Sequence, residues 1–343
     1  REEYMHTNQG IILVQSKLAV ALVCLSFTVT IMTSADVQAE SLPELGSEPQ
    51  AAESSAAKAG GDDMEKIAKM TANPVGAAWM MWTQNDYTRI NGDLVPGNEY
   101  VNSTKFQPVM SFPLDFRGED WNLIVRPVLQ YQSVPLDKDV GKLFGASPSD
   151  IVVDPGLGGI AEDAFDDRTS GFGDTALLTL LGPNRLDGNI WGVGMTQIFP
   201  TAEEDVLGQE KWQAGPAFLW AHLAKDVGGF NYGALAQHWW SYAGDDDREN
   251  TSQTDIQYFI NYRLSKTELV GMTPNIRYNW KADDSDDKLT LPIGLGYSNV
   301  YKLGKLPVRI AAEVQYSVIS PDNVGSDWNF RLLFIPVIPN PFR

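Results

Sequence analysis

Two histidines, His222 and His238, are the side chains best suited to catalysis in the strand-rich part of the chain. A hydrolase that works at a lipid interface uses a serine as its nucleophile and a histidine as its base. Neither histidine stands in a recognisable nucleophile motif, and each shares its phase with apolar residues such as Trp220 and Trp240. We therefore predict that the chain is not an enzyme and has no catalytic residues. An interfacial lipid hydrolase is kept as an alternative.

A glycine-rich stretch and several acidic runs are the candidates for holding a cofactor or a metal ion. Gly171–Ala176 resembles a dinucleotide-binding loop, but it opens a strand pattern and not a helix. The acidic runs are Glu203–Asp205, Asp245–Asp247 and Asp283–Asp287. The last of them has Lys288 where a calcium loop needs glycine and Gly294 where the closing glutamate belongs. We predict solvated loops, no cofactor and no metal site. Divalent ions that bridge these runs to anionic lipid are the alternative.

Alternation with a period of two residues dominates the chain from residue 74 onwards. From Trp121 to Tyr131 the odd positions are aromatic or aliphatic, whereas Asn122, Arg126 and Gln130 occupy even positions. This pattern predicts strands with one apolar and one polar face. About 12 such strands are predicted, near residues 76–87, 104–113, 120–132, 173–182, 188–199, 211–224, 229–242, 253–264, 268–281, 287–299, 307–319 and 327–338.

The predicted connections alternate between short turns and longer, more acidic loops. The short turns are 114–119, 182–188, 225–228, 265–267 and 302–306. The longer loops are 88–103, 133–172, 201–210, 244–252, 282–286 and 320–326. Short turns on one side and long loops on the other are typical of bacterial outer-membrane barrels. The 133–172 loop is long enough to fold inward as a constriction or a lid.

A membrane barrel explains these strands better than a soluble sandwich or a lipocalin-like barrel does. Strands of about ten to fourteen residues exceed the usual five or six and suit a tilted membrane crossing. Aromatic residues at the ends of the apolar faces fit interfacial girdles. They are Trp121, Tyr131, Trp191, Phe199, Trp212, Tyr242, Trp280 and Trp328. We predict an all-β fold, a transmembrane antiparallel up-and-down β-barrel of about 12 strands.

The polar faces carry several arginines, which a dry core would not tolerate. A wet lumen would hydrate them, and Asp255 and Glu313 would pair with some of them. The lumen-lining candidates are Arg126, Gln130, Asp255, Arg263, Arg277, Arg309, Glu313 and Arg331. The arginines would favour the entry of anions into the lumen, whereas acidic loops at its mouth would repel anions. A barrel of about 12 strands lies between filled and wide-open barrels, so an open and a plugged lumen are both alternatives.

The N-terminal region has the features of a secretory signal. Lys17 precedes the apolar run Leu18–Met32, and Val37-Gln38-Ala39 forms a small-x-small cleavage site. We predict a signal peptide over residues 1–39, a flexible periplasmic leader with a short helix (Met64–Met70) over 40–73, and the barrel over 74–343. The sole cysteine, Cys24, lies in the predicted signal, so the exported chain would hold no disulfide.

Four segments resemble an outer-membrane family that is named for the meta-pathway of phenol degradation and is often labelled a transporter. They are Asn73–Val75, Phe106–Pro113, Asp120–Pro127 and Ser170–Thr175, in that order. The resemblance runs from about residue 64 to the C-terminus. It implies a channel for small, apolar molecules, and it carries over no binding residues. One departure is that the chain has Phe342 before a final Arg343, where barrels of this kind end on an aromatic residue.

The sequence as a whole predicts a channel in the outer membrane of a Gram-negative bacterium. It would pass small, hydrophobic or aromatic molecules passively. The partners expected are outer-membrane lipid and lipopolysaccharide, the barrel-assembly machinery and a small-molecule solute. A net charge of −18 argues against nucleic acid. The alternative is a structural or surface-interaction barrel without transport.

Overall fold

The computed structural model describes residues 64–73, 76–138, 164–165 and 167–342. The chain divides into two units, Arg1–Glu53 and Ser54–Arg343, and every described residue belongs to the second. The signal peptide predicted over 1–39 and residues 40–63 of the predicted leader lie outside the described residues, as do residues 139–163 of the long predicted loop.

The described chain is a single antiparallel sheet of 14 strand segments. Their bounds are β1 (Trp79–Asn91), β2 (Glu99–Phe116), β3 (Glu119–Val134), β4 (Thr169–Phe172), β5 (Thr175–Pro183), β6 (Gly188–Phe199), β7 (Lys211–Leu223), β8 (Phe230–Gly244), β9 (Ser252–Arg263), β10 (Glu268–Met272), β11 (Asn275–Asn279), β12 (Leu289–Leu303), β13 (Leu306–Ile319) and β14 (Gly325–Ile338). A short 3-10 helix, η2 (Asp205–Leu207), lies between β6 and β7.

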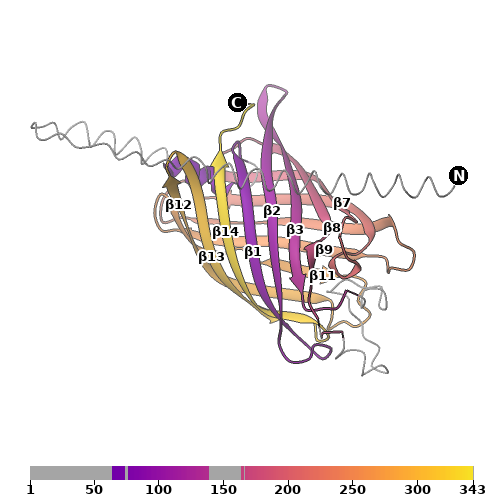
Figure 1. Ribbon diagram of the computed structural model, residues 1–343. Coiled ribbons are helices and arrows are strands. Elements are labelled where there is room, and N and C mark those ends of the chain that lie inside the picture. The colour runs from indigo at the N-terminus through magenta and orange to yellow at the C-terminus, as the bar shows by residue number, and fades with distance from the viewer. Residues whose placement is uncertain (1–63, 74–75, 139–163, 166, 343) are drawn as a thin grey trace, which may run out of the picture. The chain divides into compact units, whose positions relative to one another are not determined.

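The sheet closes into the predicted barrel. β1 pairs with β14, from Trp79 opposite Ile338 to Asn91 opposite Gly325 (Figure 1). β3 pairs with both β4 and β5, and β9 pairs with both β10 and β11, so each of these couples forms one stave. The barrel therefore has 12 staves. Closure leaves no free sheet edge, which a membrane-spanning sheet requires because lipid cannot hydrogen-bond to the backbone.

Short and long connections alternate around the barrel. The short connections are 117–118, 184–187, 224–229, 264–267 and 304–305, and they define the short-turn end. The longer ones are 92–98, 135–168, 200–210, 245–251, 280–288 and 320–324, and they define the long-loop end. In the tightest turn Arg117 and Gly118 both have positive φ angles, 57° and 79°. Two such residues make the two-residue turn whose twist matches the strands that it joins.

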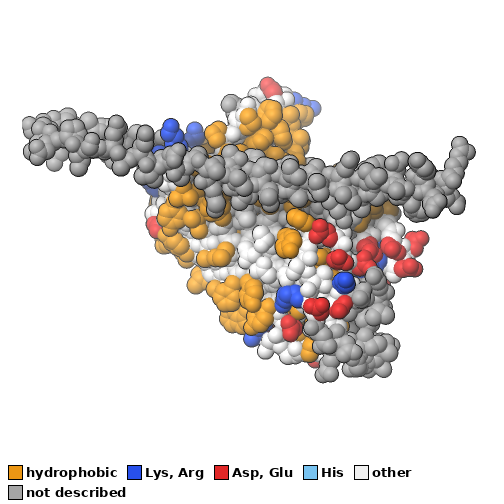
Figure 2. All heavy atoms as spheres, in the orientation of Figure 1, with side chains coloured by type: hydrophobic (Ala, Val, Ile, Leu, Met, Phe, Trp, Pro, Cys, Tyr) orange, Lys and Arg blue, Asp and Glu red, His pale blue; other side chains and the backbone are white. Residues whose placement is uncertain are grey.

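The outer surface of the barrel is apolar. Its exposed side chains occupy alternate positions along each strand, among them Met195, Phe218, Ile293, Leu295, Phe330, Leu332 and Phe334. Figure 2 shows hydrophobic side chains over the strands on one face, with most of the visible acidic side chains towards the long-loop end. Of the predicted girdle, Tyr131, Trp212, Tyr242, Trp280 and Trp328 are exposed. An apolar band of this kind is the surface that a barrel presents to lipid.

The interior differs from the simple expectation of one apolar and one polar face, because its half nearest the short turns is also apolar. The buried cluster there consists of Met80, Val109, Ile124, Leu178, Leu180, Ile190, Ala217, Leu219, Ala221, Leu223, Leu235, Leu333 and Ile335. β5 shows the effect most clearly, since Leu178 and Leu180 are buried inside while Leu181 is exposed outside. The half of the interior nearest the long loops is therefore the more polar one, whereas polar side chains are interspersed among apolar ones in the other half.

A helix over residues 64–72 precedes the first strand, where the sequence predicts one over Met64–Met70. Ala68, Thr71 and Asn73 are buried against the barrel. No helix in the described ranges is long and apolar enough to cross a membrane.

Candidate functional site in the barrel lumen

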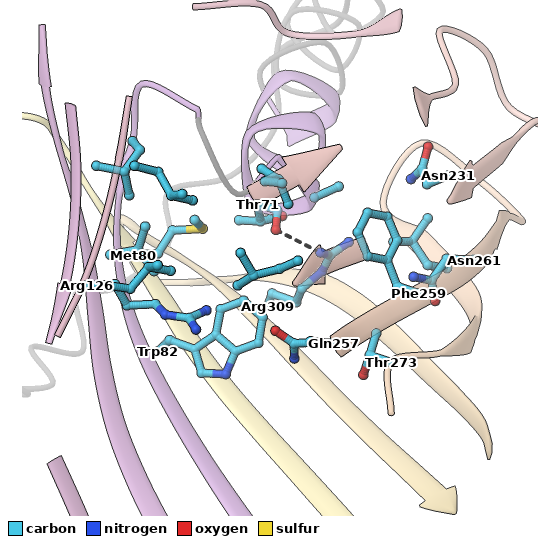
Figure 3. Close-up of a pocket in the computed structure, with 18 residues that line it drawn as sticks. Thr71, Met80, Trp82, Arg126, Asn231, Gln257, Phe259, Asn261, Thr273 and Arg309 are labelled. Carbon is cyan, nitrogen blue, oxygen red and sulfur yellow. Dashed lines mark hydrogen bonds between the residues drawn. The ribbon is translucent and has the colours of Figure 1, made fainter. Parts of the chain in front are cut away.

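Two cavities occupy the lumen, one towards each end. The outer vestibule, about 470 Å³, adjoins the long loops, and its polar lining includes Asp86, Ser103, Lys105, Gln130, Gln132, Asp255, Asn275, Arg277, Gln315, Asn329 and Arg331. The inner cavity, about 110 Å³, lies towards the short turns. It is lined by Thr71, Ala72, Met80, Trp82, Val109, Ile124, Arg126, Leu178, Leu180, Leu219, Asn231, Leu235, Gln257, Phe259, Asn261, Leu269, Thr273 and Arg309 (Figure 3).

Asp86 organises the charges of the outer vestibule. Its carboxylate accepts a hydrogen bond from Arg331 Nε at 2.7 Å and one from Gln84 Nε2 at 2.5 Å. Asn329 Nδ2 donates to it at 3.2 Å, and Lys105 Nζ lies 3.7 Å away. Asp86 and Arg331 are 6% and 5% exposed, so this pair is fully enclosed by protein. A buried carboxylate with this many partners stays ionised and fixed in position.

The boundary between the two cavities is formed at Thr273, in the break between β10 and β11. Arg331 Nη1 donates to the Thr273 carbonyl oxygen at 2.7 Å. The Glu313 carboxylate accepts from the Thr273 amide at 2.8 Å and from its hydroxyl at 2.6 Å. Thr273 lines the inner cavity and Arg331 lines the outer vestibule. These side chains therefore hold the stave break at the point where the two cavities meet.

The same break interrupts the hydrogen-bond ladder with β12. Pairing stops at Gly271 opposite Gly296 and resumes at Arg277. On β12, a Cβ added at Gly294 would lie 2.7 Å from Glu313 Oε1. Glycine at this position therefore leaves room for the Glu313 side chain to reach across β12 to the break. By accepting the hydrogen bond of the Thr273 amide, Glu313 satisfies a backbone group that the ladder with β12 leaves free.

The inner cavity combines an apolar wall with two guanidinium groups. Figure 3 shows Arg126 beside Trp82 on one side, and Arg309 reaching from β13 towards Thr71. Arg309 Nη1 donates to the Thr71 carbonyl oxygen at 3.0 Å, whereas its Nε and Nη2 are buried without a partner. Arg126 forms no hydrogen bond or ion pair with the residues that the structure describes, and its Nε is buried and unpaired. Among the residues that the structure describes, no aspartate or glutamate lines this cavity.

The helix over residues 64–72 closes the short-turn end of the lumen. Glu65 Oε2 lies 3.0 Å from Lys266 Nζ, and Glu65 Oε1 lies 3.9 Å from Arg263 Nη2 and 3.3 Å from Lys69 Nζ. After the helix, Asn73 Nδ2 donates to the Arg185 carbonyl oxygen at 2.5 Å. The hydrogen bond from Lys266, more than any other contact, lowers the pKa of Glu65 below its usual 4.5. The helix is thus fastened to two of the short turns.

The eight lumen candidates fall into three groups in the structure. Arg126 and Arg309 line the inner cavity. Gln130, Asp255, Arg277 and Arg331 line the outer vestibule. Arg263 is buried near the helix, and Glu313 is buried at the boundary. Their contribution to solute passage stays a prediction.

The pairing expected for the arginines is different in the structure. Asp255 accepts from Asn275 Nδ2 at 2.8 Å, and Glu313 accepts from Thr273 and Gln315. In the described part of the chain neither carboxylate forms an ion pair with an arginine. The partner of Arg331 is Asp86, which the sequence reasoning missed because it lies on the least regular of the predicted strands.

His222 lies near the end of β7 and His238 lies in the middle of β8, and neither is among the residues that line the two cavities. His222 Nδ1 is 3.1 Å from Asn189 Oδ1, and its ring stacks on Tyr232. His238 Nδ1 is 2.7 Å from Thr254 Oγ1, and its Nε2 is 3.5 Å from Ser252 Oγ. The Ser252 contact is at the limit of a hydrogen bond, and a threonine holds the position of the carboxylate or amide that orients the histidine in a hydrolytic triad.

The comparisons with known proteins agree with this geometry at the level of the fold. No protein-family model and no curated protein matches the chain. The crystal structure of an outer membrane channel from Pseudomonas putida F1 is similar, with a TM-score of 0.54 and 13% identity over 77% of this chain and 96% of that one. This chain has the outer-membrane β-barrel fold. Its apolar exterior places it in the outer membrane of a Gram-negative bacterium.

Two autotransporter barrels are less similar. The β domain of the Bordetella autotransporter BrkA has a TM-score of 0.39 and 10% identity, covering 76% of this chain and 98% of that one. The translocator domain of NalP from Neisseria meningitidis also has a TM-score of 0.39 and 10% identity, covering 84% and 98%. Because both TM-scores lie below 0.5, neither match adds to the argument.

Proposed function

We propose that this chain is an outer-membrane channel for the passive passage of small, apolar or aromatic molecules. The observation that carries the proposal is the inner cavity, whose lining is mostly aliphatic and aromatic and which lies behind a polar vestibule in the same lumen. Binding sites for small organic molecules are typically apolar hollows with a few well-placed polar groups. A barrel filled only for stability has no need of such a hollow.

The proposed orientation follows from the connections. Long loops of outer-membrane barrels face outward and short turns face the periplasm. A solute would then enter through the vestibule, pass Thr273 and reach the inner cavity. It would leave past the helix over residues 64–72, which is held by the Glu65–Lys266 ion pair at a short turn and by the hydrogen bond from Arg309 of β13 to Thr71. The helix would act as a movable plug.

The resemblance of four sequence segments to the family named for the meta-pathway of phenol degradation supports the same solute class. The likeness of the fold to the Pseudomonas putida channel is consistent with it. We propose membership of that family on the residues of the four segments, and passage of aromatic solutes on the lining of the inner cavity.

Conductance and permeation of residues 40–343, the chain without the predicted signal, test the proposal. We expect discrete conductance steps in planar bilayers. The barrel should also increase the entry of benzyl alcohol into vesicles, relative to vesicles without protein, by a larger factor than it increases the entry of glucose. Vesicles that contain a heat-denatured sample are the control for leakage. A correctly folded barrel that never conducts and speeds the entry of neither solute would contradict the proposal and favour a structural or surface-interaction barrel.

A further inference from the structure

The arginines of the barrel and its loops differ in how their charge is compensated. Arg331 is paired with Asp86, and at the long-loop end Arg248 is paired with Glu210 at 2.9 Å. Arg89 makes two hydrogen bonds of 2.9 Å to Asp327. Arg126 and Arg309 have no such carboxylate among the described residues, although they lie in the most apolar part of the lumen.

An unpaired guanidinium in an apolar cavity is costly unless something else supplies the negative charge. Transfer of a charged group out of water is strongly unfavourable, and proteins usually pair such groups or leave them in water. Among the described residues the inner cavity is lined by ten hydrophobic side chains larger than alanine, including Leu178, Leu219 and Phe259, and by no acidic one. Since no described residue supplies the negative charge, an anionic ligand would be a suitable partner.

The shape and chemistry of the cavity restrict what that partner can be. The planar fork of a guanidinium matches a carboxylate, to which it donates two parallel hydrogen bonds. The apolar wall favours a ligand whose remaining surface is hydrophobic, and disfavours a hydrated inorganic anion. A cavity of about 110 Å³ is somewhat smaller than the roughly 150 Å³ cavity that accommodates benzene. The volume therefore limits the ligand to at most one ring or a short branched chain.

We propose that the inner cavity is a binding site for small apolar carboxylates, with Arg126 as the principal anion-binding residue and Arg309 as the second. The aromatic or aliphatic body of the acid packs on the cluster around Leu178 and Leu219, and its carboxylate meets Arg126 beside Trp82. Arg309 contributes its free Nε and Nη2 while its Nη1 stays on Thr71. The inference rests on the proposed channel and narrows its solute class to organic acids.

Equilibrium binding of two isosteres to the full chain in detergent micelles tests the site. Benzoate and benzamide have nearly the same shape, but only benzoate is charged at pH 7. Calorimetric titration should show benzoate binding at least about tenfold more tightly than benzamide, because hydrogen bonds between charged partners are the stronger kind. This comparison needs no variant. Equal affinities for the two would overturn the inference, as would full displacement of benzoate by an equal concentration of inorganic phosphate.

Variants locate the binding. Arg126→Gln should lower benzoate affinity by about tenfold and leave benzamide binding unchanged. Arg126 forms no hydrogen bond or ion pair with the described residues, so its loss removes none of these from them. Arg277→Gln is the matched control, because Arg277 is an exposed arginine of the outer vestibule. This variant should bind benzoate with the same affinity as the parent chain. Unchanged benzoate affinity in the Arg126 variant would refute the assignment. A barrel that prefers benzoate but never conducts would refute the channel alone, and one that conducts without this preference would refute the site alone.

Discussion

The two cavities of the lumen handle buried charge in opposite ways. In the outer vestibule, Asp86 receives hydrogen bonds or ionic contacts from Arg331, Gln84, Asn329 and Lys105, so the protein neutralises its own charges. In the inner cavity, Arg126 and Arg309 face a largely apolar wall to which the described residues contribute no acidic side chain. The first arrangement fixes the wall of the lumen, and in our proposal the second leaves a charge for a solute. The same residue type is therefore structural in one region and available in the other, and substitutions should separate the two roles.

The largest effect is expected at Arg331. Arg331→Met removes the ionic partner of a buried carboxylate and also the donor to the Thr273 carbonyl. Leaving one member of a buried pair without its partner should lower the free energy of unfolding by about 3–5 kcal/mol. Urea unfolding of the barrel in lipid vesicles measures this. The double variant with Asp86→Asn should recover part of the loss, and additive losses would show that the pair is not coupled.

Arg126 should behave in the opposite way. Arg126→Met removes an unpaired charge from an apolar cavity and breaks no hydrogen bond within the described chain. The free energy of unfolding should rise by about 1–3 kcal/mol, the usual penalty for a buried polar group without a partner. The same unfolding measurement applies, with Arg277→Met as the control for loss of an exposed lumen charge. A clear loss of stability would mean that Arg126 has a structural partner. The proposed difference between the two cavities in the role of their arginines would then be wrong.

The plug helix should respond more weakly, because its ion pairs are partly exposed. Lys266 is 51% exposed in its side chain, so its pair with Glu65 is screened by solvent. Glu65→Gln should weaken docking by about 1 kcal/mol or less, which is up to about a fivefold shift in the docking equilibrium. Hydrogen exchange of residues 64–72 should accelerate by that factor. Lys66→Gln, an exposed position on the same helix, is the control and should leave exchange unchanged.

The smallest effect is a dependence of docking on pH. The pKa of Glu65 is lowered in the docked state, chiefly by the hydrogen bond from Lys266. The ionised Glu65 carboxylate therefore stabilises docking of the helix fully above the ordinary glutamate pKa of 4.5. This stabilisation is lost as the pH falls through the lowered pKa. Exchange of the helix, corrected for its intrinsic pH dependence, should be constant from pH 7 to 5 and increase below about pH 4.5. With Glu65→Gln the increase should disappear, and its persistence would assign it to another group.

Most of the architecture was predictable from the period of the side-chain pattern. Alternation gives the strands and their faces, and turn lengths give the order of the staves, since each stave pairs with the next one along the chain. The break at Thr273 was missed because Met272 and Asn275 continue the same register on β9. Sequence alternation cannot show a gap in the ladder on the other side of the strand.

The site was predictable in part. The phase of the pattern indicates that Arg126 and Arg331 face the lumen, but it does not say which carboxylate each one meets. The Asp86–Arg331 pair depends on the register of the first and last strands. The apolar inner half was hidden for a different reason: Leu178 and Leu181 are both leucines, and one faces the interior while the other faces lipid. Composition does not distinguish these two apolar environments.

Closure of the barrel by β1 and β14 also sets the order in which the molecule can assemble. Each hairpin joins strands that are close in sequence, so its loop closes at little entropic cost. Asp86 and Arg331 are 245 residues apart, and they meet only when the whole sheet has curled. Until then both terminal strands present unpaired backbone groups, which lipid cannot satisfy. The Asp86–Arg331 ion pair therefore forms only when β1 and β14 pair, and it stabilises the closed barrel against reopening between these two strands.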